Sequence, residues 1–223
     1  MNVKLLSFSQ PTLHFANKGI DDAQELIAYC ARVSNPSNQF NTDTSDKLIR
    51  YLVKHQHWSP LEMVSACLEI TTTRDIARQI LRHRSFSFQE FSQRYADPTK
   101  DLSFVLREAR LQDPKNRQNS IDAVEHETQM VWLDKQQTVI DAATNAYDWA
   151  IANGIAKEQA RAVLPEGNTV SRLYMNGTLR SWIHFIELRS ANGTQKEHQE
   201  VARACAQVIA EIFPMAANLV AKN

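Results

Sequence analysis

The sequence predicts an α+β fold that is mainly helical and contains a small, largely antiparallel sheet. Three observations support this class. Several long stretches carry apolar residues at helical spacing, whereas only a few short runs favour strands. The chain has five glycines and no GxGxxG or GxxxxGK[ST] motif, so the usual Rossmann and P-loop signatures are absent. No repeat, low-complexity run or linker divides it, and we expect residues 1–223 to form a single domain.

The first part of the chain predicts strands and helices in alternation. A short apolar run at residues 3–8 predicts a strand. Asp21 and Asp22 open a helix that runs through Arg32, and the prolyl residue at position 36 ends that segment. Ser45 is expected to cap a second helix. Residues 63–72 are apolar and rich in β-favouring side chains, which predicts a strand.

The second part is mostly helical. Residues 102–111 suit either a strand or a helix. Residues 121–153 predict a long helix ended by Gly154, and residues 158–164 predict a shorter one. The dipeptide Asn176-Gly177 is a turn signal. Two further helices are expected, at residues 179–189 and at residues 198–221, the second broken by Pro214.

Composition restricts the function. The formal net charge is zero, which argues against a general nucleic-acid coat protein. Cys30, Cys67 and Cys205 are scattered and form no CxxC, so neither a disulfide framework nor a zinc knuckle is expected. We see no signal peptide and no apolar run of about 20 residues, and we therefore expect a cytoplasmic protein with no membrane partner.

The most distinctive stretch is Arg74 to Tyr95, which reads RDIARQILRHRSFSFQEFSQRY. Ile76 and Ile80 share one side of a helix, while Arg74, Arg78 and Arg82 recur every four residues on another. Like charges at this spacing repel, so their clustering indicates an anionic partner such as a phosphate. The simpler alternative is a solvated basic surface at a helix end. The hydroxyls, amides and aromatic rings that follow the basic triplet favour the anion site.

Three other segments could carry chemistry. The loop around His57 contains a tryptophan, a hydroxyl and a proline, although it is also consistent with a tryptophan that anchors a turn. His55 and His57 offer two metal ligands with no third, so no metal site is expected. Arg161 stands among apolar neighbours, and a helix carries Arg180, His184 and Arg189; snorkelling arginines would explain both.

Taken together, these segments resemble the flavin-dependent thymidylate synthase family. The resemblance rests on the triplet Arg82-His83-Arg84, followed by seven residues and then Ser92. The His-x-Ser-Pro loop at residues 57–60, the ARxVLP segment at residues 160–165 and the arginine that ends RSWIHFIELR occur in the family's order. The likeness extends roughly from residue 31 to residue 189.

The resemblance implies a reaction and its cofactors. Deoxyuridine monophosphate (dUMP) would be methylated at uracil carbon 5 to give thymidylate. Methylenetetrahydrofolate would supply the carbon, reduced FAD the hydride, and NADPH would reduce the flavin. No enzyme cysteine would attack the ring. It also implies a homotetramer whose active sites are shared between subunits.

The resemblance also assigns residues. Arg189 would stabilise the negative charge that develops on the pyrimidine, and His57 would orient the methylene donor. Residues that match dUMP-binding positions are Gln79, Arg82, Glu90, Phe91, Ser92, Gln93, Arg94, Arg161 and Arg189. Residues that match FAD-binding positions are Ser59, Arg82, His83, Arg84, Glu90, Thr178, Arg180 and His184. At Thr178 and His184 this chain departs from the asparagine that the family often has.

A second hypothesis is a non-enzymatic binder of single-stranded RNA or DNA. In that case aromatic rings between the basic residues of positions 74–95 would stack on bases. Zero net charge counts against it. A visible absorbance spectrum separates the two hypotheses, because only the enzyme needs a flavin.

Overall fold

The structure, a computed structural model, describes residues 1–218 and is built on a four-stranded antiparallel sheet. The strands lie in the order β1-β2-β6-β3 and span Asn2–Phe8, Ser65–Thr73, Val170–Thr178 and Ser87–Glu90 in that order. The long central pair keeps one register from Ser65 opposite Thr178 to Thr73 opposite Val170. The predicted α+β class with a small antiparallel sheet is therefore confirmed.

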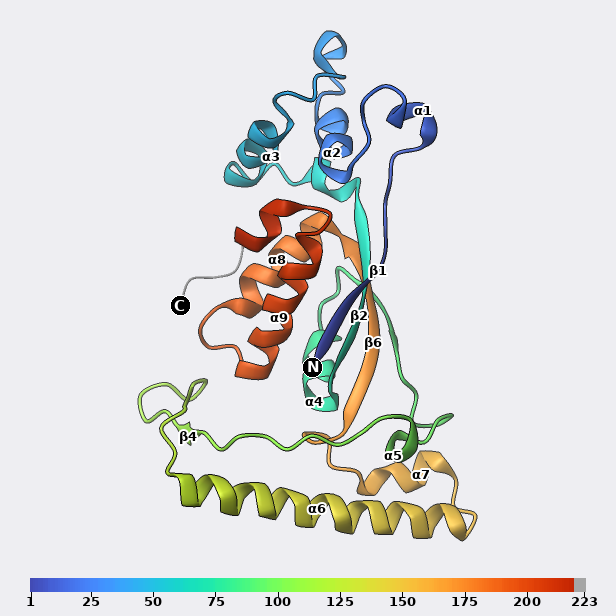
Figure 1. The fold of residues 1–223 in the computed structure, drawn as a ribbon, viewed down its shortest axis with the longest axis vertical. Helices are drawn as coiled ribbons and strands as arrows, with labels where there is room; N and C mark the ends of the chain where they lie inside the picture. Colours follow the sequence, from blue (N-terminus) through green and yellow to red (C-terminus); the bar gives the residue numbers. More distant parts are fainter. Residues whose placement is uncertain (219–223) are drawn as a thin grey trace.

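One face of the sheet holds the core. Side chains alternate along the central strands, so Leu68 and Ile70 of β2 and Leu173 and Met175 of β6 are fully buried. Helices α8 (Leu179–Ser190) and α9 (Lys196–Ile209) pack on this face, as Figure 1 shows. The fully buried Trp182 of α8 donates its indole N–H to the backbone oxygen of Ala66 at 3.0 Å, which fixes α8 on the sheet.

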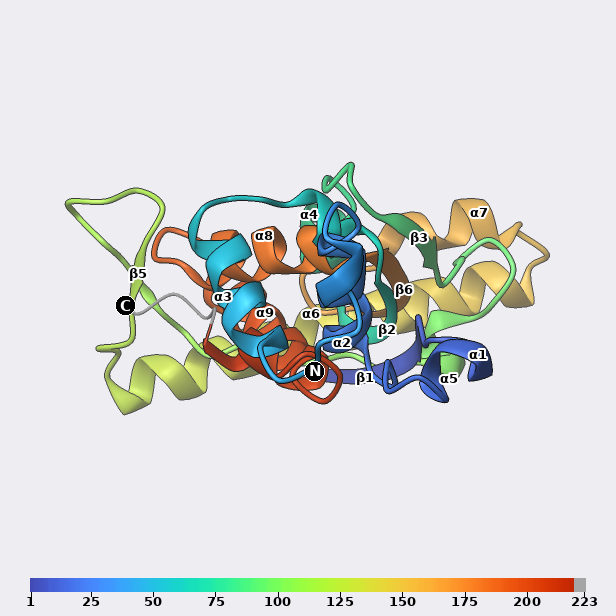
Figure 2. The same ribbon diagram turned by 90° about the horizontal axis from the view of Figure 1, so that it is seen from above.

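Two groups of helices extend the molecule at opposite ends (Figure 1), and Figure 2 looks down on it from above, along the line that joins these ends. Helices α2 (Ala23–Ala31) and α3 (Ser45–Lys54) lie at one end. The 27-residue helix α6 (His126–Ala152) runs along the other, followed by α7 (Lys157–Ala160). Gly154 has φ of +77° directly after α6, which confirms it as the predicted helix stop.

Short elements complete the chain. The basic helix α4 (Arg74–Ile80) follows β2 directly. The remaining elements are α1 (Leu13–Ala16), η1 (Pro36–Asn38), η2 (Ser59–Glu62), α5 (Pro98–Asp101), β4 (Leu111–Gln112), β5 (Ser120–Ile121), η3 (Arg161–Val163) and η4 (Pro214–Asn218). Within residues 1–218, no helix is both long enough and apolar enough to cross a membrane.

Several sequence predictions were wrong in detail. Helix α4 ends at Ile80, so Arg82 lies beyond it, and part of the expected irregular loop is strand β3. Ser45 begins α3 but does not cap it; the N-cap residue is Thr44, whose hydroxyl accepts a hydrogen bond from Arg32. The long helix begins at residue 126, because residues 120–121 pair with β4.

The predicted turn at Asn176-Gly177 is also wrong, since both residues are paired within β6. Gly177 serves a close approach instead: a Cβ there would overlap the ring of Phe86. The last helix ends at Ile209, and residues 219–221 of its predicted range lie outside the described part of the chain. Residues 102–110 lie in no named helix or strand and have one bridge, between Phe104 and Thr169, while Leu111 begins β4.

Candidate functional site

The basic triplet follows α4 as a turn, closed by the hydrogen bond from the His83 backbone N–H to the Ile80 oxygen at 3.0 Å. Arg82 and Arg84, the residues on either side of His83, are both exposed. Neither forms an ion pair with a carboxylate among residues 1–218. Two unpaired guanidinium groups from one turn are well suited to bind phosphate oxygens.

His83 points from this turn toward α8. Its Nε2 accepts a hydrogen bond from Nε of Arg189 at 2.9 Å, and its ring meets that of Phe185 edge-on at 5.0 Å. Burial, and then the charge of Arg189, lower the pKa of His83 to about 4. The ring is therefore neutral at pH 7, with its proton on Nδ1, because the Arg189 nitrogen is always a donor.

Arg189 lies in the last turn of α8, where a cation suits the helix dipole. Burial, and then the charge of Arg82, lower its pKa, but an arginine stays charged at any physiological pH. Within residues 1–218 no side chain or backbone oxygen accepts a hydrogen bond from its two terminal nitrogens. His83 thus holds the guanidinium at Nε and leaves its fork open to a ligand.

Gln79, the dUMP-position residue of α4, reaches the start of α9. Its Nε2 donates to Oε1 of Gln195 at 2.8 Å, and its Oε1 lies 3.2 Å from Nδ1 of the fully buried His198. Gln79, His83 and Arg189, together with Arg82, form what we call the Arg189 cluster. Sequence reasoning missed Gln195 and His198, because no spacing in the chain relates them to α4.

Glu90 does not lie open to a ligand. Its carboxylate accepts hydrogen bonds from Ser171 at 2.9 Å and from Arg74 at 3.4 Å, and forms an ion pair with Arg78 at 3.6 Å. Glu166 forms further ion pairs with the same two arginines. The predicted basic row on α4 is therefore neutralised within the chain at its first two positions, and the expectation of an external anion holds only for Arg82.

The segment after β3 meets the ARxVLP segment. Arg94 forms an ion pair with Glu158 at 3.0 Å, and Nε of Arg161 donates to the Glu158 backbone oxygen at 3.3 Å. Gln93 is almost fully buried, and its amide nitrogen has no partner among the described residues. Phe91 donates its backbone N–H to the oxygen of Arg172 at 2.8 Å. The structure thus places both arginines at Glu158, Arg94 at its carboxylate and Arg161 at its backbone oxygen.

Ser92 is half-buried in this segment, and its hydroxyl accepts a weak 3.4 Å hydrogen bond from the Arg94 backbone. No described histidine or carboxylate lies within hydrogen-bond distance of that hydroxyl. The residue therefore lacks the base that a serine nucleophile needs.

Four FAD-position residues gather at the other end of α8. Thr178 caps the helix, accepting a 3.4 Å hydrogen bond from the Ser181 backbone. Arg180 pairs with Glu62 of η2, the short helix that begins at the exposed Ser59. His184 is exposed and meets the ring of Trp58 edge-on at 4.6 Å. We call Ser59, Thr178, Arg180 and His184 the amino-end group.

His57 is exposed, and its ring meets Tyr51 edge-on at 5.9 Å. The ring centroids of His55 and His57 are 6.3 Å apart. Among the described residues, the acidic groups close enough to hold a metal ion are Asp21, Asp22 and Glu25. The first two are exposed and Glu25 is half-buried, and Asp22 is the N-cap of α2. The two histidines are not part of such a group.

The three cysteines do not have the environment of a nucleophile. Burial raises the pKa of each thiol, most strongly at the fully buried Cys205. A thiolate nucleophile needs a lowered pKa or an adjacent base. Cys30 lies in α2, Cys67 in β2 and Cys205 in α9, which confirms the positions expected from the sequence.

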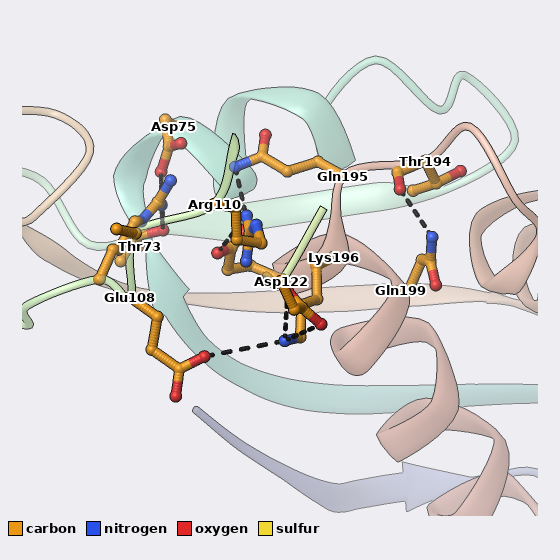
Figure 3. A network of polar contacts seen from close by, with 12 residues as sticks. Thr73, Asp75, Glu108, Arg110, Asp122, Thr194, Gln195, Lys196 and Gln199 are labelled. Atoms are coloured by element: carbon orange, nitrogen blue, oxygen red, sulfur yellow. Dashed lines mark hydrogen bonds and ion pairs between the residues drawn. The ribbon is translucent and has the colours of Figure 1, made fainter. Parts of the chain in front are cut away.

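The predicted residues thus form separate groups on one chain. A groove of about 610 Å³ opens beside Gln195, and none of the predicted residues, all of which the structure describes, lines it. Its lining is polar and includes Arg110, Arg117, Lys196 and Arg203. Figure 3 shows part of this wall, where Lys196 forms ion pairs with Asp122 and Glu108.

Comparisons with known proteins bear on the family of the chain rather than on its single site residues. The family model described as "Thymidylate synthase complementing protein" matches residues 17–215. A flavin-dependent thymidylate synthase of Synechocystis sp. is 48% identical over 217 residues, 97% of this chain and 98% of that protein. A probable flavin-dependent thymidylate synthase of Paramecium bursaria Chlorella virus 1 is 47% identical over 214 residues, 96% of each chain.

A solved structure is also similar. It is the UMP/dUMP methylase PolB of Streptomyces cacaoi bound with 5-Br UMP, with a TM-score of 0.79 and 25% identity. The match covers 98% of this chain and 92% of that one. The family expected from the arginine–histidine–arginine triplet and its flanking segments is therefore confirmed. This chain belongs to the flavin-dependent thymidylate synthase family.

Proposed function

We propose that this methyltransferase converts dUMP to thymidylate, taking the carbon from methylenetetrahydrofolate and the hydride from FAD that NADPH has reduced. The observation that carries the proposal is the open guanidinium fork of Arg189, held through its Nε by a neutral histidine. Support comes from the similar methylase PolB, which was solved with 5-Br UMP and with 5-Br dUMP.

In this proposal Arg189 activates the pyrimidine. Negative charge develops on the ring when carbon 5 becomes nucleophilic, and a fixed guanidinium beside the ring stabilises that charge without reorganisation. His83 keeps the guanidinium group in place. The imidazole does not take up a proton near pH 7, since its own pKa is about 4. No thiol is required, which agrees with the raised pKa of all three cysteines.

The nucleotide phosphate needs charged or amide donors. We assign it to Gln79, Arg82, Arg94 and Arg161, with Ser92 and Gln93 and the backbone at residues 90–91 nearby. The unpartnered amide of the buried Gln93 supports this assignment, because a buried donor without an acceptor is costly unless a ligand supplies one. Glu90 would act through the arginines that hold it, since its carboxylate is already satisfied.

FAD fits the residues that remain. Arg82 and Arg84 have no carboxylate partner among residues 1–218, and Arg180 has only an exposed one, so these cations suit the pyrophosphate. His83, His184, Ser59 and Thr178 would complete the site. When bound, the flavin supplies the hydride. His57 would orient the folate, and its exposed ring leaves it accessible to one.

We propose that the sites are completed by other subunits of a homotetramer. The separate groups on one chain support this, and so does α6. Its residues 128, 132, 135, 139, 142, 146 and 149 are all exposed and follow the 4-3 spacing of a helix-pairing seam. Trp132, Val139 and Trp149 on this seam are 44%, 52% and 63% exposed.

The seam is tested with Val139→Arg, and with Gln137→Arg as the matched control on the opposite side of α6. Sedimentation velocity should show smaller species for the first variant only. If both variants sediment as the wild type, α6 does not join the subunits.

We place the enzyme in the cytoplasm within the same proposal, because three unpaired cysteines suit a reducing compartment.

The activity is tested with purified protein. It should show flavin absorbance bands and convert dUMP to thymidylate only when methylenetetrahydrofolate, FAD and NADPH are all present. A colourless protein that flavin does not reconstitute, but that retains oligonucleotides in a salt-sensitive way, would support the nucleic-acid-binding alternative.

A further inference from the structure

The contacts of Gln79 suggest an additional residue for nucleotide binding. Its carboxamide lies between the first turn of α9 and the end of α4, with Gln195 on its nitrogen and His198 on its oxygen. Its second N–H has no acceptor among residues 1–218. Under the proposed function, this N–H is the one available to dUMP.

Hydrogen bonds connect Glu197, Gln195, Gln79 and His198 in that order, and the charge of Glu197 determines which group donates in each of them. Glu197 accepts from Arg110 at 2.7 Å and from Nε2 of Gln195 at 2.9 Å. Burial alone would raise the pKa of Glu197, but hydrogen bonds from its own backbone, Gln195 and Arg110 outweigh burial and lower it. The carboxylate is therefore charged and can only accept. Figure 3 shows Gln195 and Arg110 next to one another in this network.

Each following group takes its orientation from the one before it. Because Gln195 turns its nitrogen to the carboxylate, its oxygen faces Gln79 and must accept. Gln79 therefore donates to Gln195 and presents its own oxygen to His198. An oxygen cannot donate, so Nδ1 of His198 must carry the proton.

The other side of His198 excludes a second proton. The side chain is 0% exposed, and its Nε2 has no partner among the described residues. Burial, then the positive charge of Arg189, and then the charge that His83 gains when it is protonated in acid, lower its pKa to about 3. The ring is thus held as one neutral tautomer throughout the physiological range.

We propose that His198 is a positioning residue for the nucleotide: its Nδ1–H holds the Gln79 carboxamide oxygen, so that the amide nitrogen faces the substrate. Without this donor, the carboxamide would be held only through its nitrogen at Gln195 and could turn about that contact, so its second N–H would no longer be fixed toward the substrate. This inference rests on the proposed function, because it takes Gln79 to bind dUMP.

The test compares His198→Leu, which removes the donor, with His198→Asn, whose amide nitrogen can replace Nδ1. We expect the leucine variant to raise the dissociation constant and KM for dUMP about tenfold, the loss of one aligned hydrogen bond, with kcat within about twofold. The asparagine variant should stay within about threefold of the wild type. Flavin content and melting temperature serve as the folding controls.

Two further measurements separate positioning from a general structural role. In a Gln79→Leu background, His198→Leu should change dUMP affinity by less than about twofold, since there is no carboxamide left to orient. Two-bond ¹⁵N–¹H spectra of selectively labelled histidine should show His198 with its proton on Nδ1 at pH 7. This spectrum needs no nucleotide and reports even if the leucine variant misfolds.

The outcomes are distinct. A wild type that does not bind dUMP overturns the proposed function, and this inference with it. A wild type that binds dUMP, together with a leucine variant that binds it equally well, overturns only the role of His198. The role of His198 is also overturned if Gln79→Leu and His198→Leu weaken dUMP binding additively, or if the proton of His198 is found on Nε2.

Discussion

The two ends of α8 each present an arginine, but they hold it in different ways. At the carboxyl end, Arg189 donates from Nε to the neutral ring of His83 at 2.9 Å and is half-buried. At the amino end, Arg180 pairs with the carboxylate of Glu62, and both side chains are about 40% exposed. One arginine is fixed by a directional contact away from solvent, and the other by an exposed charge pair.

This difference indicates what each end is suited to do. An exposed ion pair contributes only about 0–1 kcal/mol and is screened by salt, so Arg180 can exchange Glu62 for a phosphate at little cost. A hydrogen bond from a charged group to a half-buried acceptor is worth about 1.5–3 kcal/mol. The carboxyl end therefore has the rigidity that transition-state stabilisation needs, and the amino end has the adaptability that cofactor binding needs.

The largest effect is expected at the carboxyl end. Arg189→Ala should lower kcat about 10²- to 10³-fold, the usual loss for one fixed donor to a developing charge, while the flavin remains bound. The matched control is Arg50→Ala on α3, whose arginine pairs, among the residues that the structure describes, only with Asp46 on the surface. Full turnover in the Arg189 variant would exclude the role assigned to this guanidinium.

The next effect tests whether the contact to Arg189 matters. His83→Leu removes the acceptor, and we expect kcat to fall about 10- to 100-fold through misplacement of the guanidinium. His83→Gln supplies an amide oxygen and should recover part of the loss. Because His83 is also an FAD-position residue, bound flavin must be measured for both variants. If flavin and kcat fall in proportion, positioning of Arg189 is not the cause.

The carboxyl end should also be sensitive to acid. The pKa values of His83 and His198 are lowered to about 4 and about 3, from about 6.5 in the unfolded chain. The unfolded state then binds more protons below pH 6.5, so the free energy of unfolding should fall as pH drops from about 6.5 toward 4. Each histidine can add a slope of up to about 1.4 kcal/mol per pH unit.

Denaturant melts at pH 7 and pH 5 check this expectation. His198→Leu should lose less stability between the two pH values than the wild type does. Equal pH dependence in the wild type and the His198 variant would exclude a buried neutral histidine at that position.

A small effect of opposite sign is expected at the amino end. Glu62→Gln removes the carboxylate from Arg180, which should change the free energy of unfolding by less than about 1 kcal/mol. Since FAD phosphate would no longer compete with that carboxylate, we expect FAD to bind up to severalfold more tightly. Fluorescence titration of the apoprotein with FAD measures this change, and weaker binding would contradict the exchange.

Neither end of α8 should depend on a thiol. Changing Cys30 and Cys67 together to alanine should leave kcat within about twofold, since burial raises both pKa values and keeps the thiols protonated. Cys205→Ala is better tested alone, because the residue is fully buried in the core and its loss leaves a small cavity. Turnover per folded flavin-bound enzyme is the measurement, and its abolition would indicate thiolate chemistry.

Local signals predicted much of the fold. Apolar spacing predicted α8, and the positive φ of Gly154 is what a helix-stopping glycine requires. The same spacing overestimated α4, because Leu81 continues the apolar period while the following residues turn toward Arg189. Local periodicity does not contain that information, since the contact joins residues 106 positions apart.

The site was predicted only in part, because contacts between residues far apart in the sequence leave no local pattern. The basic triplet and Arg189 were identifiable through the family's motif, but the state of Glu90 was not: two arginines and Ser171 already satisfy its carboxylate. His198 gave no signal at all, because it contacts Gln79 across 119 residues and stands in an otherwise ordinary amphipathic helix.

The overlap between Gly177 and Phe86 has a consequence for how this enzyme tolerates change. The Phe86 ring lies against Gly177 and also meets Trp182 edge-on at 4.8 Å, two residues after the basic triplet ends. A single methyl group added at position 177 would push that ring, and the guanidinium-bearing turn with it, away from the sheet. In a saturation mutagenesis survey scored by thymidine-free growth, this strand position should therefore be as intolerant as the residues that touch the nucleotide.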